Sequence, residues 1–311
     1  MFLYLAPLRG ITDYTFRTVY AAHFPGFDCA VAPFISSVKG KTIKRSYIKD
    51  IIPENNARLP VVPQIIGNTP NEFIVLANTM SDLGYSMVNW NIGCPFPQVT
   101  AKKRGAGLLP FPEKIRYFLD CVIPRMHSRL SIKTRIGLTD AREMDAVLPV
   151  FNAFPLAEII VHPRTGRQMY SGSIDLECFE RFLAGSAHTV VYNGDITTLD
   201  AFMKVSRRFP NINRWMIGRG ALFNPFLAES LRGAVTEPAT MGPRIKRFHD
   251  ELFAAYRDCM KNTGNAIDKM KGVWCYLAHA MPNGTMLLKR IQKTRRLDHY
   301  EEIVENAFND G

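Results

Sequence analysis

Long apolar runs are missing from this chain of 311 residues. A helix that crosses a bilayer needs roughly 20 consecutive and mostly apolar residues, and every apolar run here is shorter. The first residues, MFLYLAPL, also lack the charged start and the cleavage site of a secretion signal. We therefore expect a cytoplasmic protein that does not enter membranes.

Cysteines in metal-binding or redox spacing are missing as well. The six cysteines are scattered, with no C-x-x-C pair and no Cys/His cluster of the kind that binds zinc. No G-x-G-x-x-G follows the first predicted strand, and this absence disfavours a dinucleotide-binding open sheet. We expect a protein without disulfides or metal ions, in which most thiols are buried as small apolar groups.

Negative charge is the third shortage. The chain has 39 Lys and Arg against 28 Asp and Glu, which gives a formal net charge of +11. Basic residues cluster at 39–49, 102–104 and 289–296. A single cluster is often only solvated surface, but three on so basic a chain favour a large anionic partner, above all nucleic acid.

What the sequence does have is a repeated strand pattern. Eight short apolar or β-branched runs occur at 3–8, 28–35, 61–67, 86–93, 130–137, 158–165, 189–196 and 214–221. Apolar residues at helical spacing fill 71–84, 112–126, 140–154 and 198–209, whereas 36–60 is expected to be mostly loop. Eight strand–helix units at intervals of about 30 residues predict a parallel (β/α)8 TIM barrel over residues 1–235, with a doubly wound sheet as the alternative. We interpret 236–243 as a linker and 244–311 as a small all-helical domain.

Polar side chains gather at the predicted strand ends. Enzyme chemistry in such barrels takes place at the C-terminal ends of the strands. There the sequence places Gln64, Asn91, Cys94, Lys133, Arg135, His162 and Arg164, followed by Asn193–Asp195 and Gly218–Gly220. One Lys or His inside a barrel is often a satisfied structural group, but so many polar groups in one layer predict a site.

Three of these features suggest a chemistry. The turns NGD and GRG follow strands seven and eight, where barrels commonly bind a phosphate, and Arg219 adds a charged donor. Lys133 and Arg135 point to the same side of one strand and could stabilise an electron-rich ring such as a reduced flavin, although Lys133 could also form a Schiff base. Cys94, held between Gly93 and Pro95, is suited to donate a proton because an ordinary thiol stays mostly protonated at neutral pH.

Together these residues resemble the tRNA-dihydrouridine synthase family, flavin enzymes that reduce a uridine in tRNA. The resemblance covers nearly the whole chain and rests on an ordered set of motifs: APLRGITD (6–13), QIIG (64–67), NIGCP (91–95) with RGAGLL (104–109), IKTRIG (132–137), VHPRTG (161–166), YNGDI (192–196) and IGRGALFNP (217–225). The chain departs from the common pattern at Asn89, where an acid is frequent, at Leu8 and at residues 96–98.

The resemblance implies FMN as the cofactor and NADPH as the electron donor. It places the flavin ring near Pro7, Gln64, Lys133 and His162, and the flavin phosphate near Asn193, Gly194, Asp195, Gly218 and Arg219. Cys94 would protonate C5 of the uracil while reduced FMN delivers hydride to C6. The target base would be extruded from the folded RNA into the barrel mouth.

The resemblance also implies how tRNA is held. Asn91 would bind the uracil edge, and Arg135 or Arg164 a carbonyl or a phosphate. RNA phosphates beside the pocket would meet Lys102, Lys103 and Arg104, and the helical domain, with Lys269, Lys271 and Arg295, would bind the tRNA elsewhere. We expect a monomer. The alternatives are an FMN-dependent barrel oxidoreductase acting on a free pyrimidine or another small molecule, a flavin-free Schiff-base lyase, and a non-catalytic RNA-binding barrel.

Overall fold

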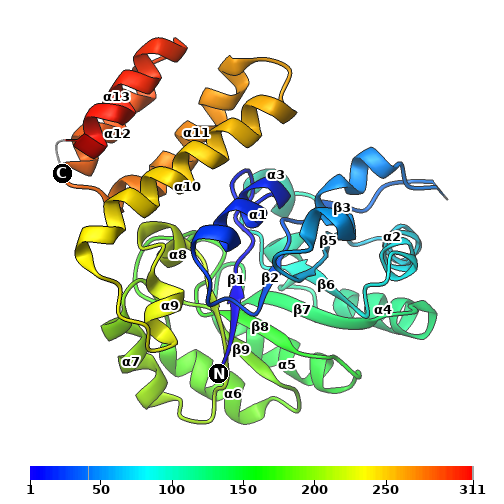
Figure 1. The fold of residues 1–311 in the computed structure, drawn as a ribbon. Coiled ribbons are helices and arrows are strands. Elements are labelled where there is room, and N and C mark those ends of the chain that lie inside the picture. Colours follow the sequence, from blue (N-terminus) through cyan, green and yellow to red (C-terminus); the bar gives the residue numbers. More distant parts are fainter. Residues whose placement is uncertain (41, 310–311) are drawn as a thin grey trace.

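Ten short strands form one sheet in the computed structural model, which describes residues 1–40 and 42–309. The strands are β1 (Phe2–Leu5), β2 (Cys29–Val31), β3 (Ile35–Ser36), β4 (Val61–Val62), β5 (Gln64–Ile66), β6 (Met87–Ile92), β7 (Arg129–Arg135), β8 (Ile159–His162), β9 (Val190–Tyr192) and β10 (Arg214–Ile217). Paired strands all run parallel, in the order β3-β5-β6-β7-β8-β9-β10-β1-β2-β4. Figure 1 shows these strands at the centre of the barrel part, with helices around them.

Two of the eight predicted strands are each split in two. The two halves of each lie at opposite ends of the strand order, so the sheet closes into a barrel. The run at 28–35 forms β2 and β3 on either side of Pro33, and the run at 61–67 forms β4 and β5 on either side of Pro63. Proline has no N–H to donate to a neighbouring strand, so the ladder is interrupted there. The Pro63 carbonyl still accepts the N–H of Asn89 in β6 at 2.9 Å. The predicted TIM barrel is thus confirmed, and the doubly wound sheet is excluded.

The helices that cover the barrel are α1 (Tyr14–His23), α2 (Pro70–Asp82), α4 (Pro112–Val122), α5 (Glu143–Asn152), α6 (Leu176–Gly185) and α7 (Leu199–Arg208). Four of them, α2, α4, α5 and α7, confirm the helices predicted from apolar spacing. The segment 36–60 is more ordered than expected, since it contains 3₁₀ helices at Arg45–Ile51 and Pro53–Asn56. The last strand is shorter than predicted because the short helix α8 (Arg219–Phe223) begins directly after it.

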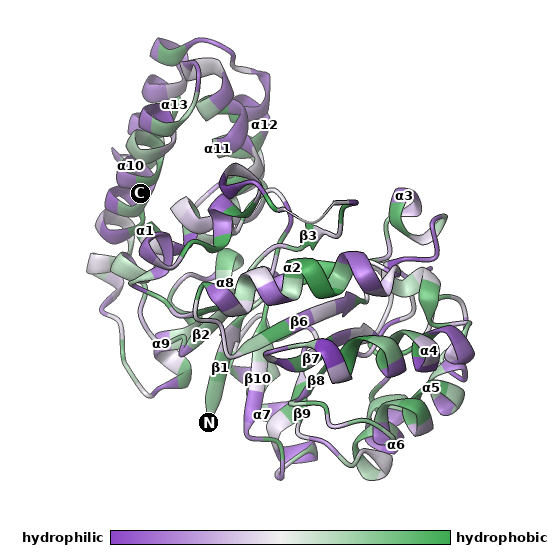
Figure 2. Ribbon diagram, turned by 90° about the vertical axis from the view of Figure 1, so that its right-hand side faces the viewer, coloured by the Kyte–Doolittle hydropathy of each residue, from purple (hydrophilic) through white to green (hydrophobic). Residues whose placement is uncertain are grey.

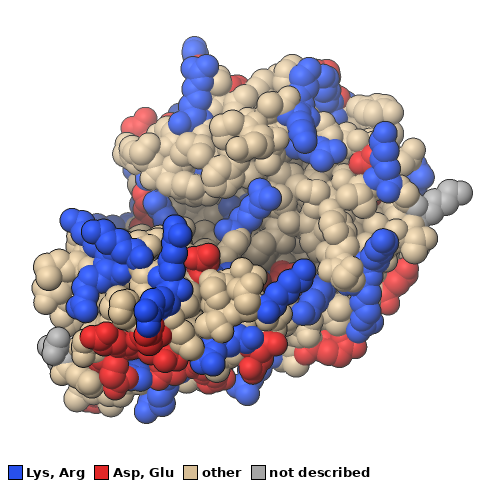
Figure 3. Space-filling model, turned by 90° about the horizontal axis from the view of Figure 1, so that it is seen from above, with Lys and Arg blue, Asp and Glu red and all other residues tan. Residues whose placement is uncertain are grey.

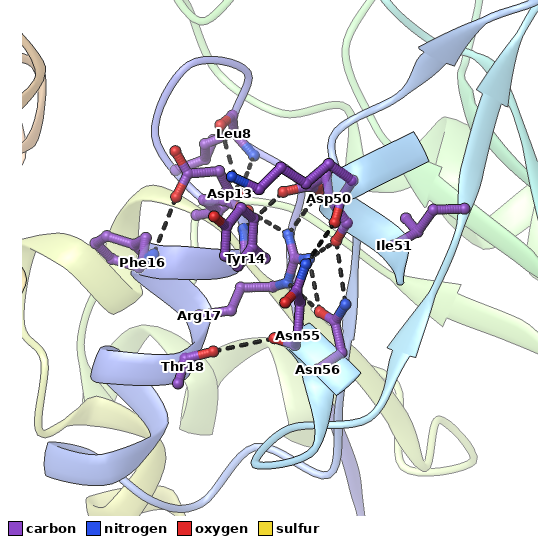
Figure 4. A network of polar contacts seen from close by, with 12 residues as sticks. Leu8, Asp13, Tyr14, Phe16, Arg17, Thr18, Asp50, Ile51, Asn55 and Asn56 are labelled. Carbon is purple, nitrogen blue, oxygen red and sulfur yellow. Dashed lines mark hydrogen bonds and ion pairs between the residues drawn. The ribbon is translucent and has the colours of Figure 1, made fainter. Parts of the chain in front are cut away.

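A buried arginine fixes this 3₁₀ segment to α1 (Figure 4). The Arg17 guanidinium donates to the carbonyls of Thr12 and Asp50, at 2.7 and 2.6 Å, and to Asn56 Oδ1 at 2.7 Å. It also pairs with the Asp50 carboxylate at 3.1 Å, and that carboxylate accepts the Tyr14 N–H. These bonds hold the start of α1, and the loop that leads into it from β1, in one position.

The last four helices form a unit that we call the tail, namely α10 (Pro238–Cys259), α11 (Thr263–Leu277), α12 (Gly284–Lys293) and α13 (Leu297–Asn309). The first of them starts at Pro238, inside the stretch 236–243 predicted as a linker, and proline is well tolerated in a first helical turn because it needs no N–H partner there. At the centre of the tail, the Tyr300 hydroxyl accepts the Trp274 indole N–H at 3.0 Å and lies 2.7 Å from His249 Nε2. The hydropathy colouring of Figure 2 shows many hydrophilic residues along α10 and α13. Among the described residues, no helix is both long and apolar enough to cross a membrane.

The tail packs against the barrel through α1. The ring of Phe248 in α10 contacts the rings of Phe16, Tyr20 and Phe24, all in or next to α1. These aromatic contacts fix the tail beside the mouth of the barrel.

Candidate active site

A cavity opens at the C-terminal ends of the barrel strands, with about 1230 Å³ of space including its open mouth. It is lined by every residue predicted to hold the cofactor: Pro7, Gln64, Lys133, His162, Asn193, Gly194, Asp195, Gly218 and Arg219. Asn91, Cys94 and Arg135 line it as well. Figure 3, seen from above, shows Lys and Arg side chains around a central hollow.

Side chains of β5, β6 and β7 form a hydrogen-bonded row beneath the cavity. Gln64, Asn89 and Ser131 are register neighbours on these adjacent strands, and all three are fully buried. Asn91 points to the same face as Asn89 because side chains two residues apart share one side of a strand. Its Nδ2 donates to Gln64 Oε1 at 2.8 Å, and Gln64 Nε2 donates to Asn89 Oδ1 at 2.8 Å. Asn91 Oδ1 accepts the N–H groups of Gly93 and Cys94 at 3.1 and 2.9 Å, so the row ends at the cysteine.

Cys94 is held in a tight loop and is 8 % exposed. Its carbonyl accepts the Ala106 N–H at 2.9 Å, and a Cβ on Gly105 would lie 2.5 Å from the same oxygen. The RGAGLL motif therefore needs glycine at position 105, where φ is +55°. Burial raises the pKa of the Cys94 thiol, and the positive charges of Arg9, Arg135 and Lys133 oppose that shift without reversing it. The group is a protonated thiol at neutral pH, which is the state a proton donor needs.

Lys133 is a cation without an anionic partner among the described residues. Burial and the neighbouring Arg135 lower its pKa to about 7, so the amine is close to half-protonated at neutral pH. Arg135 donates from Nε to the Gly93 carbonyl at 3.0 Å and from Nη1 to the Thr165 carbonyl at 2.8 Å. It therefore braces the loop that carries Cys94. Burial also lowers the pKa of Arg135, to about 10.

His162 offers a free acceptor nitrogen in the wall of the cavity. Its Nδ1 lies 2.6 Å from the Asn193 carbonyl. A carbonyl can only accept, so Nδ1 carries the proton and Nε2 is bare. Burial, reinforced by the charges of Arg135 and Lys133, holds the pKa of His162 well below its usual value. Its Nε2 is buried and has no hydrogen-bond partner among the described residues. Because buried polar atoms are nearly always hydrogen-bonded, we expect a ligand in the cavity to donate to this nitrogen.

The two glycine-containing turns, NGD at 193–195 and GRG at 218–220, lie against one another. Asp195 adopts a positive φ of +34°, and its carboxylate contacts Arg219 at 3.2 Å. A Cβ on Gly220 would lie 2.0 Å from the Ile196 carbonyl oxygen, so only glycine allows α8 to approach the loop after β9 this closely. The carboxylate of Asp195 faces arginines, which leaves its backbone N–H as the group that could meet an anion.

Arg164 does not line the cavity, contrary to the prediction that it contacts the substrate. It is 3 % exposed, and its guanidinium binds both oxygens of Asp195, at 2.8 and 2.5 Å. It also donates to the Gly172 carbonyl at 2.6 Å and to the Ser171 carbonyl at 3.2 Å. Arg164 therefore ties the loop at 193–195 to the loop at 171–172, and four of its five N–H donors are bound within the protein.

Some of the cations predicted to contact RNA are exposed, and the others form hydrogen bonds or ion pairs within the protein. Lys102, Lys103 and Arg295 are exposed. Arg104 is half-buried and donates to Asn68 Oδ1 at 3.1 Å. Lys271 pairs with Asp268 at 2.9 Å, and Lys269 pairs with Asp13 at 2.6 Å while donating to the Gly10 carbonyl at 2.7 Å. Lys269 therefore joins the tail to the loop after β1, and its contact with RNA stays a prediction.

Several residues in the cavity wall were not predicted from the sequence. Arg9 and Phe34 form a cation–π pair at 5.2 Å, and Tyr170 lies between Arg135 and Arg219, at 5.4 and 5.2 Å from its ring. Tyr276 comes from α11, so the tail contributes to the wall. Tyr170 follows the VHPRTG motif by four residues, and this closeness in sequence could have indicated it. No motif lies near Tyr276, which reaches the cavity only because the tail packs against the barrel.

Residues 4–309 match the family described as dihydrouridine synthase (Dus). The chain belongs to the dihydrouridine synthase family. This Dus chain is 28 % identical to a probable tRNA-dihydrouridine synthase of Rhodobacter capsulatus, over 98 % of this chain and 94 % of that protein. It is 29 % identical to the tRNA-dihydrouridine(16) synthase of Cupriavidus necator, over 97 % and 96 % of the two chains. The resemblance found in the sequence motifs is thereby confirmed.

Solved structures relate the fold of this Dus chain to other barrels. Morphinone reductase superposes with a TM-score of 0.54 at 12 % identity, over 76 % of this chain and 88 % of that chain. The old yellow enzyme homologue from Zymomonas mobilis superposes with a TM-score of 0.52 at 10 % identity, over 76 % and 90 %. At such identity the likeness concerns the barrel alone, and function has to be argued from the site.

Proposed function

We propose that this chain reduces a specific uridine in tRNA to 5,6-dihydrouridine, with FMN as the cofactor and NADPH as the electron donor. The observation that carries the proposal is the place of Cys94. The cysteine of the NIGCP motif stands as a protonated thiol in the wall of the cavity at the barrel mouth, in a chain that belongs to the dihydrouridine synthase family.

The residues present fit a flavin with a phosphate group. The cavity offers an unpaired cation at Lys133, a bare acceptor at His162 Nε2 and glycine-lined backbone beside Arg219. Lys133 and Arg135 would stabilise the negative charge of a reduced ring, Pro7 and Gln64 would lie along the ring, and Asn193, Gly194, Asp195, Gly218 and Arg219 would hold the phosphate. When bound, FMN would supply the hydride for C6 of the uracil after taking electrons from NADPH.

Cys94 would give the other hydrogen of the product. Its thiol would donate a proton to C5, and the thiolate left behind would be stabilised by the charges of Arg9, Arg135 and Lys133, which already act on its pKa. Asn91 would touch the uracil with its remaining N–H, because its oxygen and its other N–H are bound to backbone and to Gln64.

The exposed cations would bind the RNA. Lys102 and Lys103 follow the Cys94 loop, and Arg295 lies in the tail, so phosphates on both sides of the barrel mouth could be neutralised. A base inside a folded RNA must leave its stack to reach Cys94, and binding of its neighbours by these cations would favour that extrusion.

A second reaction is favoured by one observation. A lysine whose pKa is about 7 is an effective amine nucleophile, so Lys133 could form a Schiff base with a carbonyl substrate. Borohydride trapping of a sugar phosphate on colourless protein would support that reaction, whereas a yellow protein that resists trapping would exclude it.

The proposed function is tested by measuring dihydrouridine in tRNA by nucleoside mass spectrometry. The tRNA would come from cells stripped of their own dihydrouridine synthases and supplied with this chain or with Cys94→Ala. We expect the wild type to restore dihydrouridine and Cys94→Ala to lose most of it. No dihydrouridine from a folded, flavin-loaded wild type would overturn the tRNA reaction and favour a small-molecule flavoenzyme.

A further inference from the structure

We propose that Asn89 is a positioning residue that fixes Cys94 through Gln64 and Asn91. The inference rests on the proposed role of Cys94 as the acid. Asn89 is fully buried beneath the cavity and does not line it, so it acts only through its neighbours.

The direction of the hydrogen-bonded row follows from chemistry. The N–H groups of Gly93 and Cys94 can only donate, so Asn91 must present its oxygen to them. Its nitrogen then faces Gln64, which must present an oxygen in turn. The Gln64 nitrogen is left pointing at position 89, where only an acceptor satisfies it.

Asn89 supplies that acceptor, and Ser131 completes the row. Asn89 Nδ2 donates to Ser131 Oγ at 2.7 Å, and a hydroxyl can both accept and donate. Every member of the row has a partner, since none of them is among the buried polar atoms left unpaired in the described residues. A buried network of this kind is rigid when complete and costly when one member is missing.

Removal of the Asn89 amide would release the row from its far end. Gln64 Nε2 would lose its acceptor, and the Gln64 side chain could then rotate away from Asn91. Asn91 would in turn hold the Cys94 backbone less firmly, and the thiol would lose its fixed place in the wall.

Aspartate, which has nearly the same shape as asparagine, provides a matched variant at this position. In Asn89→Asp, the carboxylate can accept from Gln64 Nε2 and from the Ser131 hydroxyl, which only has to turn. The row would therefore survive in Asn89→Asp and be lost in Asn89→Leu, which has a similar volume and no polar group.

The experiment measures Cys94 in two independent ways. The first is the rate of alkylation by iodoacetamide, resolved by peptide mass spectrometry in flavin-loaded protein without RNA. The second is kcat and KM for tRNA. For Asn89→Leu we expect alkylation of Cys94 to be about fivefold faster, since a hydrogen bond that orders the loop is lost. We expect kcat to fall about 10- to 100-fold because the acid is misplaced, with KM within about twofold of the wild type. Asn89→Asp should stay close to the wild type in both.

Cys259 and Cys275 are exposed and serve as internal references for the alkylation. Unchanged Cys94 alkylation and kcat in Asn89→Leu would overturn the proposal, as would an Asn89→Asp variant as impaired as Asn89→Leu. If Asn89→Leu does not fold, Asn89→Ala replaces it with the same expected result. If Cys94→Ala still makes dihydrouridine, the acid role fails, but the alkylation result still decides whether Asn89 fixes Cys94.

Discussion

Arg164 and Asp195 form a two-pronged ion pair, with distances of 2.8 and 2.5 Å, behind the glycine loops of the cavity. Asp195 also contacts Arg219, which does line the cavity. The buried arginine is therefore linked to the half-buried Arg219 through a shared carboxylate. We therefore expect Arg164 to affect ligand binding although it does not line the cavity.

Replacement of Arg164 by lysine should weaken FMN binding about tenfold. An ammonium cannot make two parallel bonds to a carboxylate, so Asp195, and with it Arg219, would be less firmly held. FMN affinity of the apoprotein, measured by quenching of flavin fluorescence, checks this. The control is Arg167→Lys in the same loop, because Arg167 is exposed. An equal affinity in Arg164→Lys and Arg167→Lys would show that the ion pair has no part in the cofactor site.

Gly220→Ala should impair the same site by displacement of backbone. The added Cβ would meet the Ile196 carbonyl at 2.0 Å, which forces α8 away from the loop after β9. We expect flavin content after purification to fall severalfold and the melting temperature to drop. Gly242 is the matched control, since it lies inside α10 with no atom within 4 Å of a new Cβ. Gly242→Ala should leave flavin content unchanged.

The lowered pKa of Lys133 predicts that FMN binding depends on pH. The amine is protonated up to about pH 10.5 in the unfolded chain but only to about pH 7 in the folded one. Folding therefore releases a proton in that window, and the contribution of this group to stability rises with pH across it.

Binding of a ligand that requires the ammonium takes the proton back. FMN affinity of the apoprotein should therefore decrease from pH 7 to 9, by at most about tenfold per pH unit. Fluorescence titrations over this range check the slope. Lys133→Met should bind FMN more weakly but with a flat profile, and a wild-type profile as flat as that of Lys133→Met would contradict the assignment.

Substitutions of two cations of the tail should have different effects, one on stability and the other on RNA binding. Lys269→Gln breaks a largely buried ion pair with Asp13, so the free energy of unfolding should fall by about 2 kcal/mol. Arg295→Gln should leave thermal unfolding unchanged, weaken tRNA binding and reduce the slope of log affinity against log salt by about one. Calorimetry and salt-dependent binding assays on both variants check this pair. A normal melting temperature in Lys269→Gln would refute the contact with Asp13.

The sequence was most informative where function depends on strand ends. Gln64, Cys94, Lys133 and His162 could be assigned to one cavity because parallel strands in a barrel all end on the same side. The sequence was least informative about the partners of cations. Arg164 and Lys269 have partners, Asp195 and Asp13, at sequence separations of 31 and 256. Only the folded arrangement brings such pairs together, and a charge count treats engaged and free cations alike.

Tyr276 gives the tail a second importance. Because this side chain of α11 is part of the cavity wall, replacing or shortening the tail would also alter the cavity. Any shift of the tail relative to the barrel would likewise move Tyr276 in the cavity wall. Under the proposed function, RNA binding by the tail and the fit of the target base are therefore coupled.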